Sequence, residues 1–419
     1  MGQSLAVPIT EKVVEAGSSA DMHYAISAIQ GWRVSMEDSH CCCLPFSSET
    51  PDWFYFAVFD GHAGKNASIY CSTYLLPKIR EKFAQLTEKP LTDDELNNNV
   101  ELDPEIPREI QHLSAAIHES FIMIDDEMKL KPDFRDETFS SGTTALVLVV
   151  TPSHLVFGNC GDSRAILTRD GSVIFKTKDH KPQDDSERVR IIKAGSSVIT
   201  GRVDGNLAVS RAIGDFSFKT NASLSTIEQA VSPEPTISVV TRHPDDNFAV
   251  LACDGVWDVM DNDQVSEFIL NRLRVTDNVL EISKCLIDAC LYKDSKDNMT
   301  AIIIVFPGAP KVDPGLREKD KEIEEIIKSE MEKIISAEKS EHSAYPLIKK
   351  LSSNDLFPDE YTLYSKISFV VDLLDQLKPE RDRTKDYSTG CIQMVPNSQL
   401  FFKQVAARYN ACYLNNEDP

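Results

Sequence analysis

Acidic residues stand beside several of the most apolar runs in this sequence. Asp60 follows the apolar run 54–59, Asp254 follows the run 248–253, and Asp297 stands shortly before the run 301–306. A carboxylate that is buried without a partner costs several kcal/mol, so each of these side chains requires a cation or strong hydrogen bonds. Because the arrangement recurs, we expect the carboxylates to share a metal site.

A fourth acidic cluster lies in GWRVSMEDSH, residues 31–40, which supplies Glu37 and Asp38. Hard oxygen ligands without a cluster of His and Cys suit Mg²⁺ or Mn²⁺ better than zinc. Two such cations ~4 Å apart would bridge one water and acidify it. The predicted reaction class is therefore direct hydrolysis of a phosphate ester.

Two basic residues adjoin these clusters. Arg33 is suited to bind a phosphate through two parallel hydrogen bonds, and His62 to protonate a leaving oxygen near neutral pH. Both have simpler alternatives, because His62 could cap the helix that begins nearby and Arg33 could pair with a neighbouring carboxylate. Gly61, between Asp60 and His62, is either a turn glycine or a backbone-carbonyl ligand.

The elements that must position these residues form a mixed pattern. Short apolar runs predict strands, and helical periodicity appears between them without a regular alternation of strand and helix. The predicted strands are 54–59, 144–150, 155–157, 165–168, 237–240, 248–253 and 301–306. The predicted helices are 63–83, 114–128, 186–194 and two segments within 263–292. We therefore expect an α+β fold with mainly antiparallel sheets that stack on each other and have helices outside them.

Four regions follow along the chain. We expect a flexible N-terminal segment over residues 1–20, a catalytic domain over 21–308, a helical appendage over 309–382 and a tail, partly helical, over 383–419. Pro310 and Pro314 mark the start of the appendage, whose first helix is strongly charged. Two apolar stripes predict a pair of helices that packs on itself. The stripes are Ile323, Ile326, Ile327, Met331, Ile334 and Ile335, then Leu363, Ile367, Val370, Leu374 and Leu377.

Composition excludes several classes of function. The formal net charge of −22 disfavours nucleic acid as a main partner. Ten cysteines without a Cys-x-x-Cys spacing indicate a reducing compartment rather than a disulfide framework. The sequence contains no apolar stretch long enough to cross a bilayer. Gly2 is a candidate for N-myristoylation and hence weak membrane association, although Ala6 stands where that signal usually has Ser or Thr.

Two near matches to other enzyme classes are incomplete. The segment GHAGKN, residues 61–66, is too short for a phosphate-binding loop, and Asn66 stands where Ser or Thr would bind Mg²⁺. No cysteine is followed six residues later by arginine, so the sequence lacks the signature of a phosphatase with a cysteine nucleophile. Neither an ATPase nor a covalent thiol mechanism is favoured.

Several long motifs occur in the order found in the PPM family, the type 2C protein phosphatases, which the sequence resembles over residues 20–306. Besides the acidic clusters, these motifs are SGTTA at 141, GNCGDSRA at 158, GNLAVSRAIGD at 205 and SPEP at 232. Several long motifs in one order are far more specific than a single pattern. The charged helical appendage also resembles one found in animal members.

The resemblance implies two central antiparallel sheets with a two-metal centre at one edge between them. It also implies a role for individual residues. Asp60 would bridge both metals, and the further direct or water-mediated ligands would be Glu37, Asp38, the Gly61 carbonyl, Asp254 and Asp297. Asp162 and Asp258, with Asp254, would form a weaker third metal site; Arg33 would bind phosphate, His62 would be the general acid, and Arg202 would lie on a flap near the substrate peptide. Taken alone, Asp162 could simply be a turn residue after Gly161.

The leading prediction is a protein serine/threonine phosphatase in which water or hydroxide between two Mg²⁺ or Mn²⁺ ions attacks the phosphorus without a phosphoenzyme. We expect a monomeric enzyme in the cytoplasm, and in the nucleus as well, acting on phosphorylated proteins. One alternative is a scaffold, non-catalytic or with a dual role, that docks partners through the appendage. Another is a metallohydrolase that prefers phosphodiesters.

Overall fold

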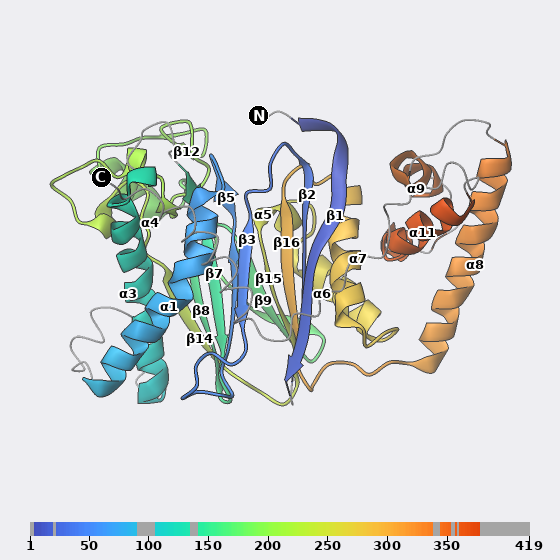
Figure 1. Cartoon of the computed structure of the whole chain (residues 1–419), viewed down its shortest axis with the longest axis horizontal. Coiled ribbons are helices and arrows are strands. Elements are labelled where there is room, and N and C mark those ends of the chain that lie inside the picture. The colour runs from blue at the N-terminus through green and yellow to red at the C-terminus, as the bar shows by residue number, and fades with distance from the viewer. Residues whose placement is uncertain are drawn as a thin grey trace, which may run out of the picture.

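The protein is seen in a computed structural model that describes residues 4–19, 22–89, 105–134, 141–337, 344–352, 357 and 360–377. Two β-sheets stack face to face in the middle, with a layer of helices outside each, so the layers run α–β–β–α (Figure 1). A further group of helices lies beyond the second helical layer. The predicted α+β class is confirmed.

The larger sheet has six strands in the order β1-β2-β16-β15-β9-β10, and every pair in it is antiparallel. In that order the strands are Ser4–Ser19, Met22–Arg33, Met299–Val305, Asp246–Ala252, Arg164–Arg169 and Ser172–Lys176. The Asp170-Gly171 turn joins β9 to β10, and both residues have positive φ (48° and 77°). Two positive φ values suit a tight hairpin between twisted strands.

The second sheet has five antiparallel strands in the order β14-β8-β7-β4-β3. They are Thr236–Thr241, His154–Cys160, Ala145–Val150, Phe54–Phe59 and Ser39–Cys43. Strands β7 and β8 are buried along their whole length, because the other sheet covers one face and helices cover the other. The facing sides of the two sheets share one apolar cluster, which includes Ile26, Phe56, Leu148, Leu251 and Ile302.

Helices seal the outer faces of both sheets. Helices α1 (Asn66–Glu88) and α3 (Arg108–Lys129) pack on the five-stranded sheet, and α5 (Asp254–Trp257), α6 (Asn262–Leu273) and α7 (Val279–Tyr292) pack on the six-stranded sheet (Figure 1). Each layer has its own apolar cluster against its sheet. This packing fixes the strand ends that carry the acidic residues.

Smaller elements lie near the upper edge of the sheets in Figure 1. One short sheet joins β13 (Ile213–Gly214), β6 (Gly142–Thr143) and β5 (Gly61–His62). A lobe over residues 176–235 contains α4 (Asp185–Lys193) and the hairpin of β11 (Val198–Ile199) and β12 (Arg202–Val203). We call this lobe the flap. Three 3₁₀ turns complete the described elements: Pro132–Phe134, Phe216–Phe218 and Thr226–Glu228.

The C-terminal appendage contains α8 (Pro314–Ala337), α9 (Ala344–Ser352), α10 (Glu360–Tyr364) and α11 (Ile367–Leu377). The two predicted apolar stripes meet in it, because Ile327 and Met331 of α8 are buried in the same cluster as Val370 and Leu374 of α11. Residues of α6 and α7 belong to that cluster too, so the appendage packs on the catalytic body. Ile326, which we predicted in the apolar stripe, is instead 42% exposed.

The N-terminal segment corrects one expectation. Residues 4–19, which we expected to be flexible, form the edge strand β1, paired with β2 from Ser4 opposite Arg33 to Ser19 opposite Met22. Lys12 adds an ion pair with the buried Asp288 of α7 at 2.6 Å. The strand is mostly exposed and is held chiefly by backbone hydrogen bonds, so it lacks the long apolar run on which the sequence prediction relied.

The other predicted strands and helices appear within a few residues of their expected limits, apart from the longer α3, which begins at Arg108. The tail over 383–419, which we predicted to be partly helical, lies outside the described residues, as do residues 378–382. Domain boundaries stay predictions.

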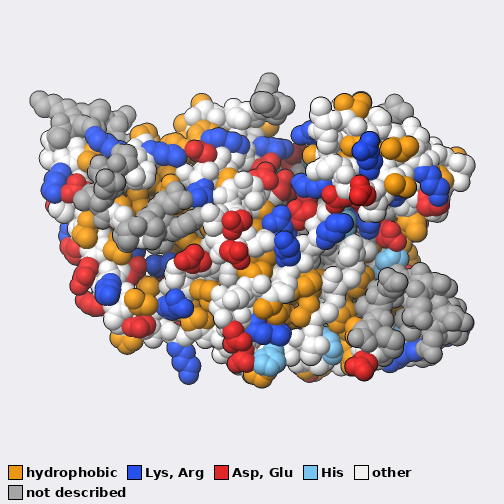
Figure 2. Space-filling view, turned by 180° about the vertical axis from the view of Figure 1, so that it is seen from behind, with side chains coloured by type: hydrophobic (Ala, Val, Ile, Leu, Met, Phe, Trp, Pro, Cys, Tyr) orange, Lys and Arg blue, Asp and Glu red, His pale blue; other side chains and the backbone are white. Residues whose placement is uncertain are grey.

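Among the described residues, no helix combines the length and apolarity of a membrane span. Asp and Glu side chains are interspersed with Lys and Arg on the face seen in Figure 2, so the net negative charge is not gathered into one patch there.

Candidate metal centre

Asp60 occupies the gap between β4 and β5, where the apolar strand ends at the edge of the sheet. Its backbone is fixed by β6–β7, since Thr144 N donates to Asp60 O at 2.9 Å and Asp60 N donates to Thr144 Oγ1 at 3.2 Å. Thr143 Oγ1 donates to the same carbonyl at 3.0 Å. The carboxylate is therefore presented from a rigid backbone, as a precise metal ligand requires.

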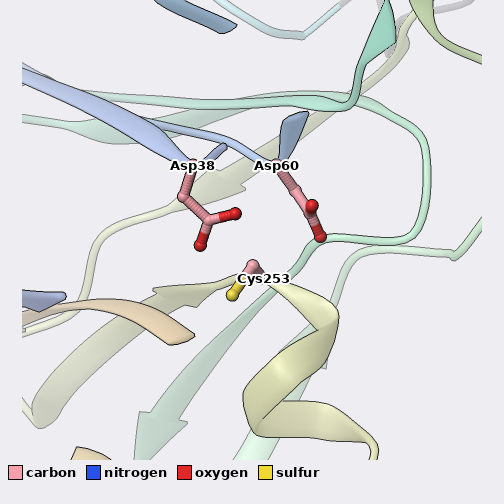
Figure 3. A group of neighbouring side chains, drawn as sticks. All are labelled: Asp38, Asp60 and Cys253. Atoms are coloured by element: carbon pink, nitrogen blue, oxygen red, sulfur yellow. The ribbon is translucent and has the colours of Figure 1, made fainter. Parts of the chain in front are cut away.

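Asp38, Asp60 and Cys253 point toward one another from the two sheets (Figure 3). One ligand atom from each lies within 4.8 Å of the others. Asp38 immediately precedes β3, and Cys253 follows β15 in the opposite sheet. Thr300 of β16 donates to Asp38 Oδ2 at 2.7 Å. The two sheets thus contribute jointly to this group.

Asp60 belongs to a second group as well, together with Asp162 and Asp254, again with one ligand atom from each within 4.8 Å. Asp254 is the first residue of α5, and only Cys253 separates it from β15. Asp162 lies in the turn between β8 and β9 and is only 4% exposed, so it is not a solvated turn residue. Asp60 is the carboxylate common to both groups, as expected for a bridging ligand.

The electrostatics of these carboxylates show uncompensated negative charge. Burial, reinforced by the charges of Asp254 and Asp38, raises the pKa of Asp60 well above its usual range. Burial and the charges of Asp162 and Asp297 do the same to the pKa of Asp254. Burial raises the pKa of Asp38 to about 6, against the hydrogen bonds from Thr300 and Cys253. Carboxylates crowded in this way are stabilised in their charged form by cations.

Arg33 and Asp297 form the adjoining part of the site. Arg33 Nη1 donates to both carboxylate oxygens of Asp297, at 2.8 and 2.9 Å, and Nη2 donates to Glu37 Oε2 at 3.1 Å. The ends of β2 and β16 are neighbours in one sheet, which explains how residues so distant in sequence meet. Arg33 therefore does pair with neighbouring carboxylates, the alternative left open by the sequence.

Backbone and side-chain contacts fix the positions of Glu37 and Gly61. Asn298 Oδ1 accepts from Glu37 N at 2.9 Å, and Gly64 N donates to Glu37 Oε1 at 2.8 Å. Gly61 packs so closely on the Glu37 carbonyl that a Cβ there would clash with it. Asn298 also donates to the carbonyls of Gln30 at 2.8 Å and Ser35 at 3.0 Å, so this one side chain ties β2 and the following loop together.

His62 lies beside this group and does not cap a helix. Its Nε2 is 2.7 Å from Asp215 Oδ2, whereas α1 begins after Lys65 without a side-chain cap. Burial alone would lower the pKa of His62, but the charge and hydrogen bond of Asp215 outweigh it and raise the pKa. The charged form of the imidazole is therefore favoured, which suits a proton donor.

Lys181 balances part of the negative charge of Asp162 and Asp254. Its Nζ pairs with Asp162 Oδ2 at 2.5 Å. Asp258 caps the C-terminal end of α5, and burial raises its pKa, with Lys181 acting against the shift and Asp162 reinforcing it. The resemblance assigns Asp162 and Asp258 to a third metal site, and the charges of both also raise the pKa of Asp254.

Arg202, one of the predicted site residues, does not join the cluster. Arg202 is exposed on β12 of the flap and donates to Asn206 O at 2.7 Å, rather than to any carboxylate of the cluster in the described residues. Gly2 lies outside the described residues. The substrate role of Arg202 and the acylation of Gly2 stay predictions.

Several residues complete the site although no role was predicted for them from the sequence. They are Asp215, Lys181, Cys253, Asn298 and Thr300. Three of them immediately follow or precede predicted ligands or lie within quoted motifs: Cys253 before Asp254, Asn298 after Asp297, and Asp215 at the end of GNLAVSRAIGD. Their position next to a predicted ligand or within a family motif could have identified these three residues. Nothing in the sequence around Lys181 indicated a role for it.

Comparisons with known proteins agree with this geometry. A family model described as protein phosphatase 2C matches residues 22–299, and one described as the protein serine/threonine phosphatase 2C C-terminal domain matches residues 300–375. The chain is 37% identical to protein phosphatase 1B of Rattus norvegicus over 388 residues, 91% of this chain and 96% of that one. It is also 37% identical to protein phosphatase 1A of Bos taurus over 398 residues, 93% of this chain and 99% of that one.

Solved structures show the same fold. A phosphatase from Toxoplasma gondii superposes with a TM-score of 0.57 at 25% identity, covering 71% of this chain and 96% of that one. A serine-threonine phosphatase 2C from the same organism gives a TM-score of 0.55 at 22% identity, covering 73% and 100%. With these findings the fold and the acidic centre define a metal-dependent protein phosphatase. The chain belongs to the protein phosphatase 2C family, also called PPM, and is of the animal type with a C-terminal appendage.

Proposed function

We propose that this phosphatase hydrolyses phosphoserine and phosphothreonine monoesters by direct attack of water, without a phosphoenzyme, at a centre for two Mg²⁺ or Mn²⁺ ions. The observation that carries the proposal is that Asp60 is shared by two groups of potential ligands, one with Asp38 and one with Asp162 and Asp254. A shared carboxylate between two clusters is what a bridged pair of cations requires.

The residues present fit such a pair of cations. The donors are mainly carboxylate oxygens, which Mg²⁺ and Mn²⁺ prefer, and burial together with the charges of neighbouring carboxylates raises the pKa of Asp60 and of Asp254. Two ions held there would supply that charge and lower the pKa of the water between them. Glu37, Asp38, Asp60, Asp254 and Asp297, with the Gly61 carbonyl, are the proposed direct and water-mediated ligands, and Asp162 and Asp258 are proposed for a weaker third site.

Arg33 and His62 are the proposed substrate-handling groups. A guanidinium has five N–H donors, so Arg33 can bind a phosphate while Asp297 and Glu37 fix its orientation. His62, held in its charged form by Asp215, would donate a proton to the departing serine or threonine oxygen. Arg202, on the flap, is proposed to contact the peptide around the phosphate.

A thiol mechanism is disfavoured at this site. Cys253 lies within the Asp38–Asp60 group, but burial and the charges of Asp38 and Asp60 raise its pKa well above the usual range. A thiol that stays protonated is a poor nucleophile. Water is therefore the nucleophile that this environment supports.

The decisive experiment measures phosphate release from a phosphothreonine peptide with millimolar Mn²⁺ or Mg²⁺, with and without chelator. We expect turnover that depends on the added ion and that exceeds turnover of a phosphodiester of the same alcohol. A folded protein that releases no phosphate at any ion concentration would refute the proposal. Preference for the diester would assign the site to another class of hydrolase.

The proposal places the enzyme in the cytoplasm, and in the nucleus as well, as a monomer acting on phosphorylated proteins. The eight cysteines in the described part of the chain are free and buried, which supports a reducing compartment. Imaging of the tagged full chain and its elution volume on a sizing column test these two points.

A further inference from the structure

The C-terminal appendage contacts the loop of residues 293–298, which joins α7 to β16 and ends in Asp297 and Asn298. We propose that Tyr345 and Lys349 of α9 are positioning residues that hold this loop in the conformation that presents Asp297 to the centre. The inference rests on the proposed cation site and adds that docking of the appendage is coupled to cation affinity.

Three polar contacts from α9 hold the first half of the loop. Tyr345 Oη donates to Asp294 Oδ1 at 3.0 Å. Lys349 Nζ donates to the Tyr292 carbonyl at 3.0 Å and to Asp294 Oδ2 at 3.4 Å. Asp294 has a φ of 68°, the left-handed conformation that often ends a helix, and its N–H donates to the Leu291 carbonyl at 3.2 Å. The contacts from α9 therefore reach the point where α7 ends and the loop begins.

The ring of Tyr345 contacts the segment that carries Arg33. It packs edge-on against Trp32, the residue before Arg33, with ring centroids 5.6 Å apart, and stacks on Tyr292 at 5.2 Å. Lys296 of the loop lies over the Trp32 ring, with Nζ 4.4 Å from its centroid. Helix α9 therefore touches both chain segments whose ends meet in the Arg33–Asp297 ion pair.

The second half of the loop contacts the chain segments next to the centre. Ser295 Oγ donates to the Gly255 carbonyl at 2.7 Å, next to Asp254. A Cβ on Gly31 would lie 2.7 Å from the Asp297 carbonyl, so the loop lies directly against β2 with no side chain between them. Because these contacts are close, we expect a shift of the loop at Asp294 to change the position of Asp297.

The test uses Tyr345→Phe, which removes only the hydroxyl, and Lys349→Met, alone and combined in the full-length chain. The matched control is Lys333→Met on α8, because Lys333 is an exposed appendage lysine paired with Glu330 within its own helix. The primary readout is the Mn²⁺ dissociation constant, measured without substrate from the electron paramagnetic resonance signal of free Mn²⁺. Circular dichroism and the thermal midpoint in chelator report folding separately.

We expect the double variant to bind Mn²⁺ ~5-fold more weakly, the lower end of typical coupling between sites. Its turnover number at saturating Mn²⁺ should match that of the unmodified protein, and the control should bind normally. Because coupling is reciprocal, Mn²⁺ should also slow hydrogen exchange of the α9 amides in the unmodified protein.

Equal Mn²⁺ affinity in the double variant and the unmodified protein would overturn the inference while leaving the proposed function intact. Weaker binding by the control to the same degree would overturn it too, because the effect would then not be specific to the loop. If the unmodified protein itself failed to bind Mn²⁺, the proposed function would fail first.

Discussion

His62 Nε2 and Asp215 Oδ2 lie 2.7 Å apart although 153 residues separate them in the sequence. Asp215 is 2% exposed, and its backbone N donates to the Ser141 carbonyl at 3.2 Å. Gly142 lies so close to the Asp215 carboxylate that any side chain there would clash. The carboxylate is therefore fixed in place, and it fixes the orientation and charge of the imidazole.

The first prediction concerns that pair. Asp215→Asn keeps the volume but removes the charge that raises the pKa of His62. We expect kcat for a phosphothreonine peptide at neutral pH to fall ~10-fold or more, because a smaller fraction of His62 would carry the proton, and general acid catalysis typically contributes ~100-fold or more. The measurement is the pH profile of kcat, whose upper limb should move to lower pH. An unmoved profile would mean that Asp215 has only a packing role.

The second prediction concerns proton donation by His62. His62→Gln should lower kcat on the order of 100-fold for phosphothreonine, whose alkoxide is a poor leaving group. For p-nitrophenyl phosphate, which needs little protonation, the loss should be much smaller. The comparison requires both substrates at saturating Mn²⁺. Equal losses for the two would count against an acid role.

The third prediction concerns Asp60. Asp60→Asn should reduce activity by at least the ~100-fold that loss of an outer-shell metal partner costs, because this carboxylate serves both ligand groups. In chelator, however, the variant should unfold at the same or a higher temperature than the unmodified protein. The substitution removes a buried negative charge that Asp254 and Asp38 repel. A lower midpoint in chelator would contradict this account of the electrostatics.

The fourth prediction concerns pH. Burial raises the pKa of Asp38 from its usual 3.8 to about 6. The ion-free folded state thus binds a proton that the unfolded state has released, and its stability falls as pH rises from about 4 through about 6. Above that range bound cations offset the charge, and below it protons compete with them. The gain in thermal midpoint on adding Mn²⁺ should therefore grow as pH rises through about 6; a constant gain would exclude Asp38 from the site.

The fifth prediction concerns a buried ion pair beside the segment that carries Asp215, since Gly214 N donates to Asp125 Oδ1 at 2.8 Å. Lys219 Nζ and Asp125 Oδ1 are 2.6 Å apart, and both side chains are almost fully buried. Lys219→Met leaves Asp125 without its counter-charge and should cost ~3 kcal/mol of unfolding free energy. Lys193, paired with Glu228 on the surface, provides the control, and Lys193→Met should change stability by less than ~0.5 kcal/mol. Denaturant unfolding in chelator measures both, and similar costs would argue against burial as the cause.

The sequence was enough to predict the central sandwich and the acidic cluster. Strands such as β4, β7, β15 and β16 are buried apolar runs, and burial on both faces is what hydrophobic patterning detects best. Asp60 and Asp254 were recognisable because each ends such a run. Their convergence required the sheets to stack, which the pattern of strands and helices favoured and the structure describes.

Other features could not be predicted, for physical reasons. Strand β1 depends on backbone pairing with β2 and on Lys12–Asp288, which leave no apolar signature. The Asp162–Lys181 and His62–Asp215 pairs depend on loops being brought together by the whole fold. The contacts of α9 with Asp294 and Trp32 are long-range in the same sense, because nothing local in residues 344–352 points to a loop 50 residues earlier.

Strand β2 is paired on one side with β1 and on the other with β16, residues Met299–Val305. During ribosomal synthesis, β2 emerges long before the strand that completes its hydrogen bonding. Until then its open edge exposes unpaired backbone groups, the feature that invites association with other chains. Chains that end before residue 299 lack β16, so they should depend on chaperones or be degraded. None of these shortened chains should have phosphatase activity.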